Sequence, residues 1–110
     1  MGIHDREHLE ITTAKQFSQW LNKNFDSSPG VWLVTHKKAS GVKAPTYDEM
    51  VRVALCYGWI DSVPGKVDDM RSKLYFSPRK KGSGWSASNK ARIKELIAEG
   101  KIKQSALDGI

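Results

Sequence analysis

The spacing of apolar residues predicts a first helix over residues 14–24. Four large apolar side chains there fall at helical spacing, which places them on one face of a helix. Thr12 or Thr13 precedes this segment and supplies the hydroxyl group that caps a helix start. The expected buried stripe consists of Phe17, Trp20, Leu21 and Phe25.

A second helix is predicted over residues 47–57. Thr46 precedes it and Glu49 follows three residues later, which is the pattern of a capping box in which each side chain bonds the backbone of the other. Gly58 suits the turn at the C-terminal end of this helix. The side chains expected to face inward are Tyr47, Met50, Val51, Ala54 and Leu55.

A third helix is expected from Ser86 or Ser88, either of which can cap it, to about Glu99. Gly100 follows the last turn and is typical of a helix C-terminus. The apolar residues expected to face inward are Ile93, Leu96 and Ile97.

Short segments rich in β-branched and aromatic residues predict strands over residues 9–11, 31–35, 59–61 and 73–77. Pro64-Gly65 is a strong turn signal and is expected to close the third strand, while Pro78 stops the fourth. The order β-α-β-α-β-β-α predicts an α+β fold, in which a short, mainly antiparallel sheet packs against about three helices. A chain of 110 residues supports one core, so we expect a single domain over residues 1–110.

Composition indicates the compartment. The mean hydropathy is −0.51, and the longest apolar run spans only residues 31–34, far too short to cross a membrane. The polar N-terminus lacks the apolar region of a signal peptide. Cys56 is the only cysteine, which excludes an internal disulfide. We therefore expect a cytoplasmic protein that does not insert into membranes.

Positive charge is concentrated in the C-terminal part of the chain. Residues 1–65 carry seven Lys or Arg and seven Asp or Glu, whereas residues 66–110 carry eleven and five. The whole formal charge of +6 therefore lies in the last 45 residues. Such asymmetry favours an anionic partner, and a solvated basic surface is the alternative.

The segment over residues 76–89 is the main candidate for a functional site. It places basic residues and glycines directly before the third helix, where backbone N–H groups and the positive end of the helix dipole favour an anion. The alternative is structural: Trp85 fills the core, Ser86 caps the helix, and the lysines are solvated. The expected anion-binding residues are Arg79, Lys80, Lys81, Ser83, Trp85, Ser86 and Asn89, joined on one positive face by Lys37 and Lys38.

Asp61 follows an apolar pair, so we expect a partly buried carboxylate that needs a partner. Arg71 and Arg79 are the candidate partners, in a structural ion pair that fixes the basic loop; a role as general base is the alternative. Cys56 is interpreted as a small buried hydrophobe, with no catalytic role. The three histidines are too scattered for a zinc site, and we predict no metal and no other cofactor.

The chain resembles the YdeI/OmpD-associated (bacteriocin-protection) family over nearly its whole length. The main matching segments are Ala-Leu-Cys-Tyr-Gly-Trp-Ile-Asp-Ser over 54–62, Phe-Ser-Pro-Arg-Lys over 76–80 and Ser-Gly-Trp-Ser-Ala-Ser-Asn over 83–89. The resemblance implies a link to protection against bacteriocins or cationic antimicrobial peptides and brings no established reaction or cofactor. Longer members carry a further basic helical segment, so the resemblance is to a short member without it. Because a domain at +6 repels cationic peptides, a direct protective role by charge is not expected.

These observations favour a non-catalytic module that binds an anionic ligand, either phosphate-containing or nucleic acid, without sequence-specific recognition. One alternative is a small enzyme in which Asp61 acts with Arg79 as phosphate or oxyanion holder. Another is a protein–protein adaptor whose partner is anchored by exposed Trp20, Trp59 or Trp85.

Overall fold

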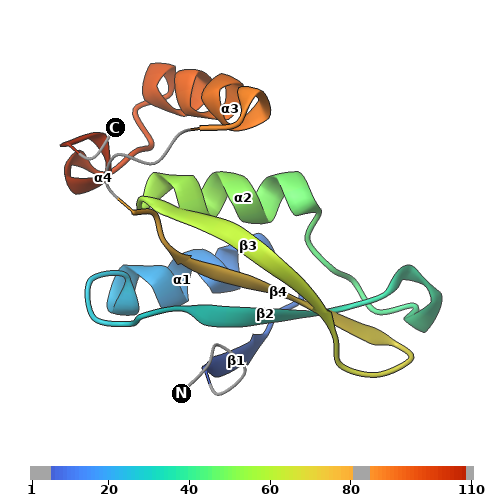
Figure 1. The fold of residues 1–110 in the computed structure, drawn as a ribbon. Helices are drawn as coiled ribbons and strands as arrows, with labels where there is room; N and C mark the ends of the chain where they lie inside the picture. The colour runs from blue at the N-terminus through green and yellow to red at the C-terminus, as the bar shows by residue number, and fades with distance from the viewer. Residues whose placement is uncertain (1–5, 81–84, 109–110) are drawn as a thin grey trace.

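The computed structural model of the protein describes residues 6–80 and 85–108 (Figure 1). Its four strands form one mixed sheet in the order β1-β2-β4-β3. Strand β1 runs parallel to β2, and the other two pairings are antiparallel, which confirms the predicted α+β fold with a mainly antiparallel sheet. Along the chain the elements are β1 (Glu7–Glu10), α1 (Ala14–Asn24), β2 (Val31–His36), the 3-10 helix η2 (Lys38–Ser40), α2 (Tyr47–Cys56), β3 (Trp59–Lys66), β4 (Arg71–Pro78), α3 (Ala87–Ala98) and the short α4 (Gln104–Asp108).

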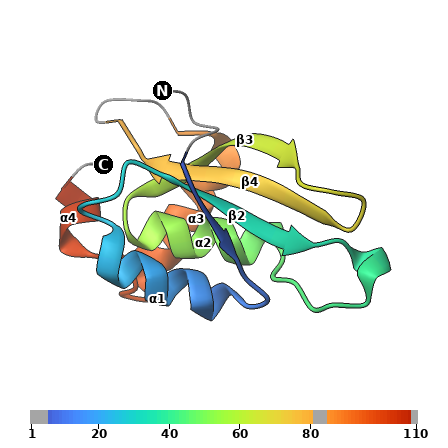
Figure 2. The same cartoon turned by 90° about the horizontal axis from the view of Figure 1, so that it is seen from below.

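The core lies between the sheet and the pair of helices α1 and α2, and α3 packs against the outer side of α2 (Figures 1 and 2). Phe17 of α1 meets Phe76 of β4 with ring centroids 5.1 Å apart. Burying one such large apolar side chain stabilises the fold by roughly 1.5–3 kcal/mol. The least exposed members of this core include Phe17, Leu21, Leu33, Val51, Ala54, Leu55, Trp59 and Phe76.

The predicted helix starts are confirmed by their caps. The Thr13 hydroxyl accepts a hydrogen bond from the Gln16 amide, and the Gln16 side chain accepts one from the Thr13 amide, so Thr13 caps α1. Thr46 and Glu49 form the same reciprocal pair at the start of α2. Each box satisfies two amides that a helix start otherwise leaves without a partner.

Two residues expected to face inward are exposed instead. Tyr47 is 50% exposed because it is the first residue of α2 and its ring lies at the edge of the core. Ile97 is 49% exposed because α3 packs on the domain along a narrow stripe, which consists of Ile93 and Leu96.

The predicted turn at Pro64-Gly65 is wrong. Strand β3 continues through both residues to Lys66, and the chain reverses over residues 67–70. There the Asp68 carboxylate accepts hydrogen bonds from the amides of Met70 and Arg71, at 2.9 and 2.8 Å, and so holds the turn. Pro64 is tolerated within β3 because this strand is at the edge of the sheet, where one side of the backbone needs no partner.

None of the helices in the described part of the chain combines the length and the apolar character needed to cross a membrane.

Candidate anion-binding surface

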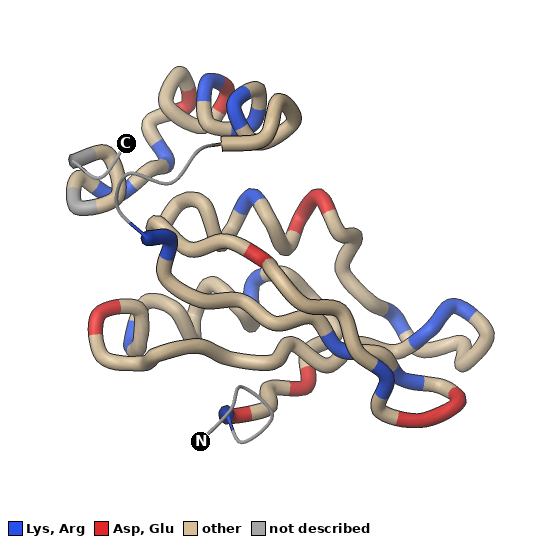
Figure 3. The backbone as a smooth tube through the Cα atoms, in the orientation of Figure 1, with Lys and Arg blue, Asp and Glu red and all other residues tan. Residues whose placement is uncertain are grey.

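Two backbone hydrogen bonds at the C-terminal end of α2 gather basic segments of the chain. The Gly58 carbonyl accepts a bond from the Arg79 amide, and the Cys56 carbonyl accepts one from the Lys103 amide, both at 2.9 Å. These bonds hold the end of β4 and the link between α3 and α4 at one end of the molecule (Figures 1 and 3). We call the four basic residues there the basic end: Arg79, Lys80, Lys101 and Lys103.

Aromatic rings position two side chains of the basic end. The Arg79 guanidinium lies 4.0 Å from the centroid of the Trp85 ring, and Trp85 is itself half-buried against the core. The Lys103 ammonium lies 5.3 Å from the ring centroids of both Phe25 and Tyr57. Ring faces attract cations and also restrict where they can move, so both charges have defined positions. Trp85 packs against the core, as the structural alternative expected, and its ring also lies beside the Arg79 guanidinium.

At the start of α3, the structure confirms the predicted cap at Ser86 but directs the Asn89 side chain to another residue. Ser86 caps the helix, since its hydroxyl accepts a bond from the Asn89 amide at 3.2 Å. The Asn89 side chain accepts a hydrogen bond from the Arg92 guanidinium at 3.0 Å. Because Arg92 also bonds Asp48 of α2, Asn89 supports the contact between α3 and α2. Lys81 and Ser83, also expected at this site, lie outside the described residues.

An ion-pair network fixes α3 on α2 and with it the position of the helix start. The Asp48 carboxylate accepts bonds from Arg52 at 2.7 Å and from Arg92 at 2.8 Å, and Arg52 also pairs with Glu95 at 2.7 Å. The hydrogen bond from Arg92, followed by that from Arg52, holds the pKa of Asp48 below its usual value. The two helices are therefore joined by charge as well as by the apolar stripe of α3.

Lys37 and Lys38 do not belong to the same face, which corrects the prediction. They follow β2 at the end where His36 pairs with Arg71, and the Lys37 amide donates to the Met70 carbonyl at 2.7 Å. Arg79 follows the other end of β4, eight residues after Arg71, which at about 3.3 Å per residue is roughly 26 Å away. Lys37 and Lys38 therefore lie at one end of the sheet and Arg79 beyond the other end.

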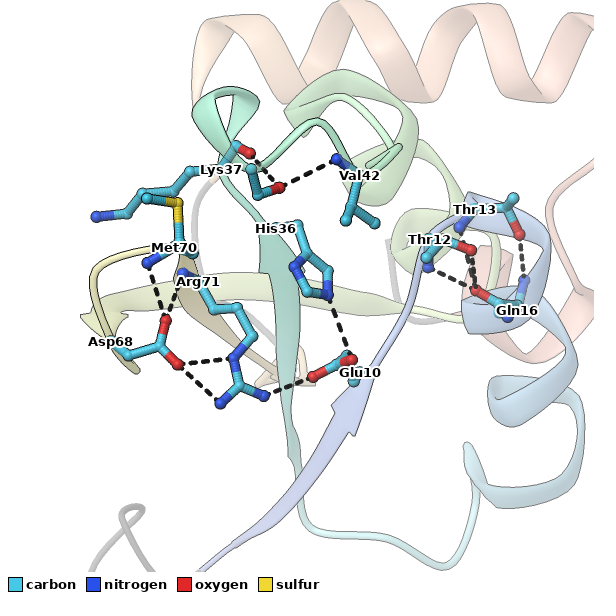
Figure 4. Close-up of polar contacts among 11 residues, drawn as sticks. Glu10, Thr12, Thr13, Gln16, His36, Lys37, Val42, Asp68, Met70 and Arg71 are labelled. Atoms are coloured by element: carbon cyan, nitrogen blue, oxygen red, sulfur yellow. Dashed lines mark hydrogen bonds and ion pairs between the residues drawn. The ribbon is translucent and has the colours of Figure 1, made fainter.

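The predicted ion pair between Asp61 and Arg71 is also wrong. Arg71 donates to Glu10 at 2.7 Å and to Asp68 at 2.9 Å, where it ties the β3–β4 turn to β1 (Figure 4). Its hydrogen bonds hold the pKa values of both carboxyl groups below their usual range, and His36 adds to the effect on Glu10. Sequence reasoning could not find this arrangement because β1 and the turn are far apart in the chain.

Asp61 is instead bonded to Tyr47, whose phenol donates to its carboxylate at 2.8 Å. Burial raises the pKa of the Tyr47 phenol, and the Asp61 carboxylate raises it further. Asp61 is partly buried, as expected, and its carboxylate is bonded to the first residue of α2.

Cys56, Trp20 and Trp59 are packed within the domain. Burial raises the pKa of the half-buried Cys56 thiol, so it stays protonated and is a poor nucleophile. Trp59 is 1% exposed, which excludes it as an adaptor anchor. Trp20 packs on Trp59 with an edge-to-face geometry and donates to Glu7 at 3.0 Å. Among the described residues, no three His, Cys, Asp or Glu side chains are arranged to hold a metal ion.

The structure adds a cavity and two lysines that the motifs did not indicate. Lys101 and Lys103 flank a hollow of about 400 Å³ beside Cys56 and Tyr57. Both lysines follow Gly100, which ends α3 with a left-handed φ of 68° and lets the chain turn back toward α2. The available signal was the excess of basic residues after position 65, which counted these lysines but could not place them.

The chain belongs to a family described as a domain of unknown function (DUF8412), whose model matches residues 9–109. Comparison with curated proteins and with solved structures gave no match.

Proposed function

We propose that this domain is a non-catalytic module that binds phosphate groups, free or in nucleic acid, at the basic end. One observation carries the proposal: two basic segments are bonded to the C-terminal end of α2 through the Arg79 and Lys103 amides, and aromatic rings lie beside both of these side chains. Lys101 lies in the same segment as Lys103 and pairs with Glu99 at 3.4 Å. Arg and Lys at defined positions are the groups that proteins use to contact phosphates. The N-terminus of α3 follows Trp85 directly, so the positive end of a helix dipole lies on the Arg79 side of this surface, whereas Lys101 and Lys103 follow the C-terminal end of the same helix.

Two features argue for charge-based binding without sequence preference. In the described part of the chain, the four residues of the basic end lie outside helices and strands, and base-reading motifs are not evident in the sequence. The Arg79 guanidinium lies over the Trp85 ring, and neither a cation nor a ring face distinguishes one base from another. We extend the proposal to an indirect part in resistance to bacteriocins or antimicrobial peptides, supported by the resemblance to YdeI/OmpD-associated proteins.

The alternative of an enzyme built on Asp61 and Arg79 has less support. Its carboxylate is bonded to Tyr47 on α2, while Arg79 lies on Trp85 beyond the end of β4. These different partners favour the binding module over the enzyme.

Fluorescence anisotropy with labelled single-stranded DNA of about twelve nucleotides tests the proposal. The double substitution Lys80→Gln and Lys103→Gln removes two charges from the basic end. We expect weaker binding and a salt slope smaller by about 0.7 for each lysine that contacts a phosphate. Inorganic tripolyphosphate as competitor shows whether phosphate alone is enough.

The matched control is the double substitution Lys37→Gln and Lys38→Gln, which removes the same charge at the opposite end of the sheet. It should lower affinity only by the small, general effect of net charge. Equal losses in both double variants would refute a localised site. Binding that does not weaken between about 50 and 200 mM salt would refute phosphate recognition altogether.

A further inference from the structure

A second cavity lies at the other end of α2, between the first turn of this helix and the sheet. Its volume is about 410 Å³, within the range of small-molecule sites. The strands run on beyond the start of α2 toward the β3–β4 turn, so this part of the inner sheet face has no helix above it (Figure 1). Tyr47 and Met50 form the helix side, and Thr35, Pro64 and Leu74 form the floor.

An irregularity in β3 shapes one wall of this cavity. Asp61 pairs with Phe76 and Pro64 pairs with Leu74, so three steps along β3 correspond to two along β4. The extra residue is a bulge, a device that bends an edge strand and changes the direction of its side chains. Because Phe76 and Leu74 both face the core side, the bulge returns Pro64 to the same side as Asp61.

Asp61 is the acidic residue among those that line this cavity. It accepts one hydrogen bond, from the Tyr47 phenol at 2.8 Å, whereas a carboxylate can accept about four. Within residues 6–80 and 85–108, no Lys, Arg or His forms an ion pair with it. Lys73 also borders the cavity, but its ammonium lies 4.3 Å from the Trp32 ring and 3.1 Å from the His8 ring nitrogen.

We propose that this cavity binds a small organic amine, with its ammonium group on the Asp61 carboxylate and its apolar body between Met50, Pro64 and Leu74. A partly buried carboxylate with no cationic partner among the described residues gains most from a ligand that brings one. An anion would be repelled at the same place. The apolar surface of the cavity explains why the amine needs a non-polar body. The inference is independent of the basic end, which lies at the opposite end of α2.

The amide spectrum of the ¹⁵N-labelled protein, titrated with phenethylamine, tests the proposal. We expect saturable shifts at Met50, Asp61 and Leu74, with a dissociation constant of about millimolar order for so small a ligand. The neutral analogue 2-phenylethanol has the same ring and nearly the same size, so it isolates the charge. Its affinity for the unaltered protein should be at least about tenfold lower.

Two variants test whether the Asp61 carboxylate is the group that binds the ammonium of the amine. Asp61→Asn keeps the size of the side chain and should weaken phenethylamine about tenfold or more while leaving 2-phenylethanol unchanged. Asp69→Asn is the control, because Asp69 is an exposed carboxylate in the nearby turn that pairs with Lys66 at 3.5 Å. Phenethylamine should bind this variant as it binds the unaltered protein.

Equal affinity for the amine and the alcohol would overturn the proposal, and this comparison does not depend on any variant folding. The proposal also fails if Asp69→Asn weakens the amine as much as Asp61→Asn does. Shifts confined to the basic end, or no saturable shift, would likewise refute it.

Discussion

The glycine at the C-terminal end of α2 provides the sharpest test of how the fold positions the basic end. Gly58 has a φ of 76°, in the left-handed region that costs a residue with a Cβ about 1–2 kcal/mol. The added methyl group of Gly58→Ala would lie 3.4 Å from the Ala106 Cβ of α4, which is ordinary contact. Alanine also restricts the unfolded chain, which offsets about 0.4–1 kcal/mol. We therefore expect a net loss of roughly 0.5–1 kcal/mol in the free energy of unfolding.

Urea denaturation of Gly58→Ala and of Gly41→Ala separates backbone strain from contact. Gly41 has the same φ of 76°, but a Cβ there would have no atom within 4 Å. The two variants should therefore lose similar stability, within about 0.5 kcal/mol, with unchanged denaturant slopes. A loss at Gly58 more than about 1.5 kcal/mol greater than at Gly41 would show that α4 cannot accommodate a methyl group, contrary to the 3.4 Å spacing. A stabilised Gly58→Ala would refute the left-handed cap itself.

Two further predictions concern the core and the polar network at the β3–β4 turn. Trp59→Phe should lower the free energy of unfolding by about 2–3 kcal/mol, measured in urea, because it removes buried volume and the bond that the indole donates to the Phe25 carbonyl at 3.2 Å. Arg71→Gln should lower the melting temperature slightly at about pH 7, where the Glu10 and Asp68 carboxylates that it holds are ionised in both states. Because Arg71 lowers their folded pKa values, this difference should shrink as the pH falls below about 4, and a difference that persists at about pH 2 would contradict the assignment.

The helices could be predicted because their boundaries are local signals. Thr46 and Glu49 are three residues apart, so the capping box at the start of α2 can be recognised in the sequence and is present in the structure. Gly58 and Gly100 end two helices with positive φ, as expected of the only residue type that adopts this conformation without strain. The burial of a residue at a helix end was harder to predict, as Tyr47 shows. Such a residue is buried only if another element of the fold packs over it, which the local sequence does not reveal.

The basic end could be predicted only in part because it is assembled by contacts between distant segments. Arg79 was identified from its place before a helix, but the partner segment was taken to be Lys37 and Lys38. Nothing in the local pattern reveals that the Lys103 amide reaches the Cys56 carbonyl, 47 residues earlier in the chain. The charge counts predicted a positive surface formed by the C-terminal part of the chain. They could not show that β4 pairs antiparallel with β2, which places Arg79 at the end of the sheet opposite Lys37.

The failed turn prediction at Pro64-Gly65 and the Asp61 cavity both concern the same irregular stretch of β3. Proline within a strand is tolerated at a sheet edge or at a bulge, and β3 has both features. The irregularity lies between Asp61 and Pro64, which both border the hollow next to α2, and the pairing with β4 is regular again from Pro64 to Lys66. Pro64-Gly65 therefore stays within the strand, and the chain reverses only where the Asp68 carboxylate accepts the amide bonds of the turn.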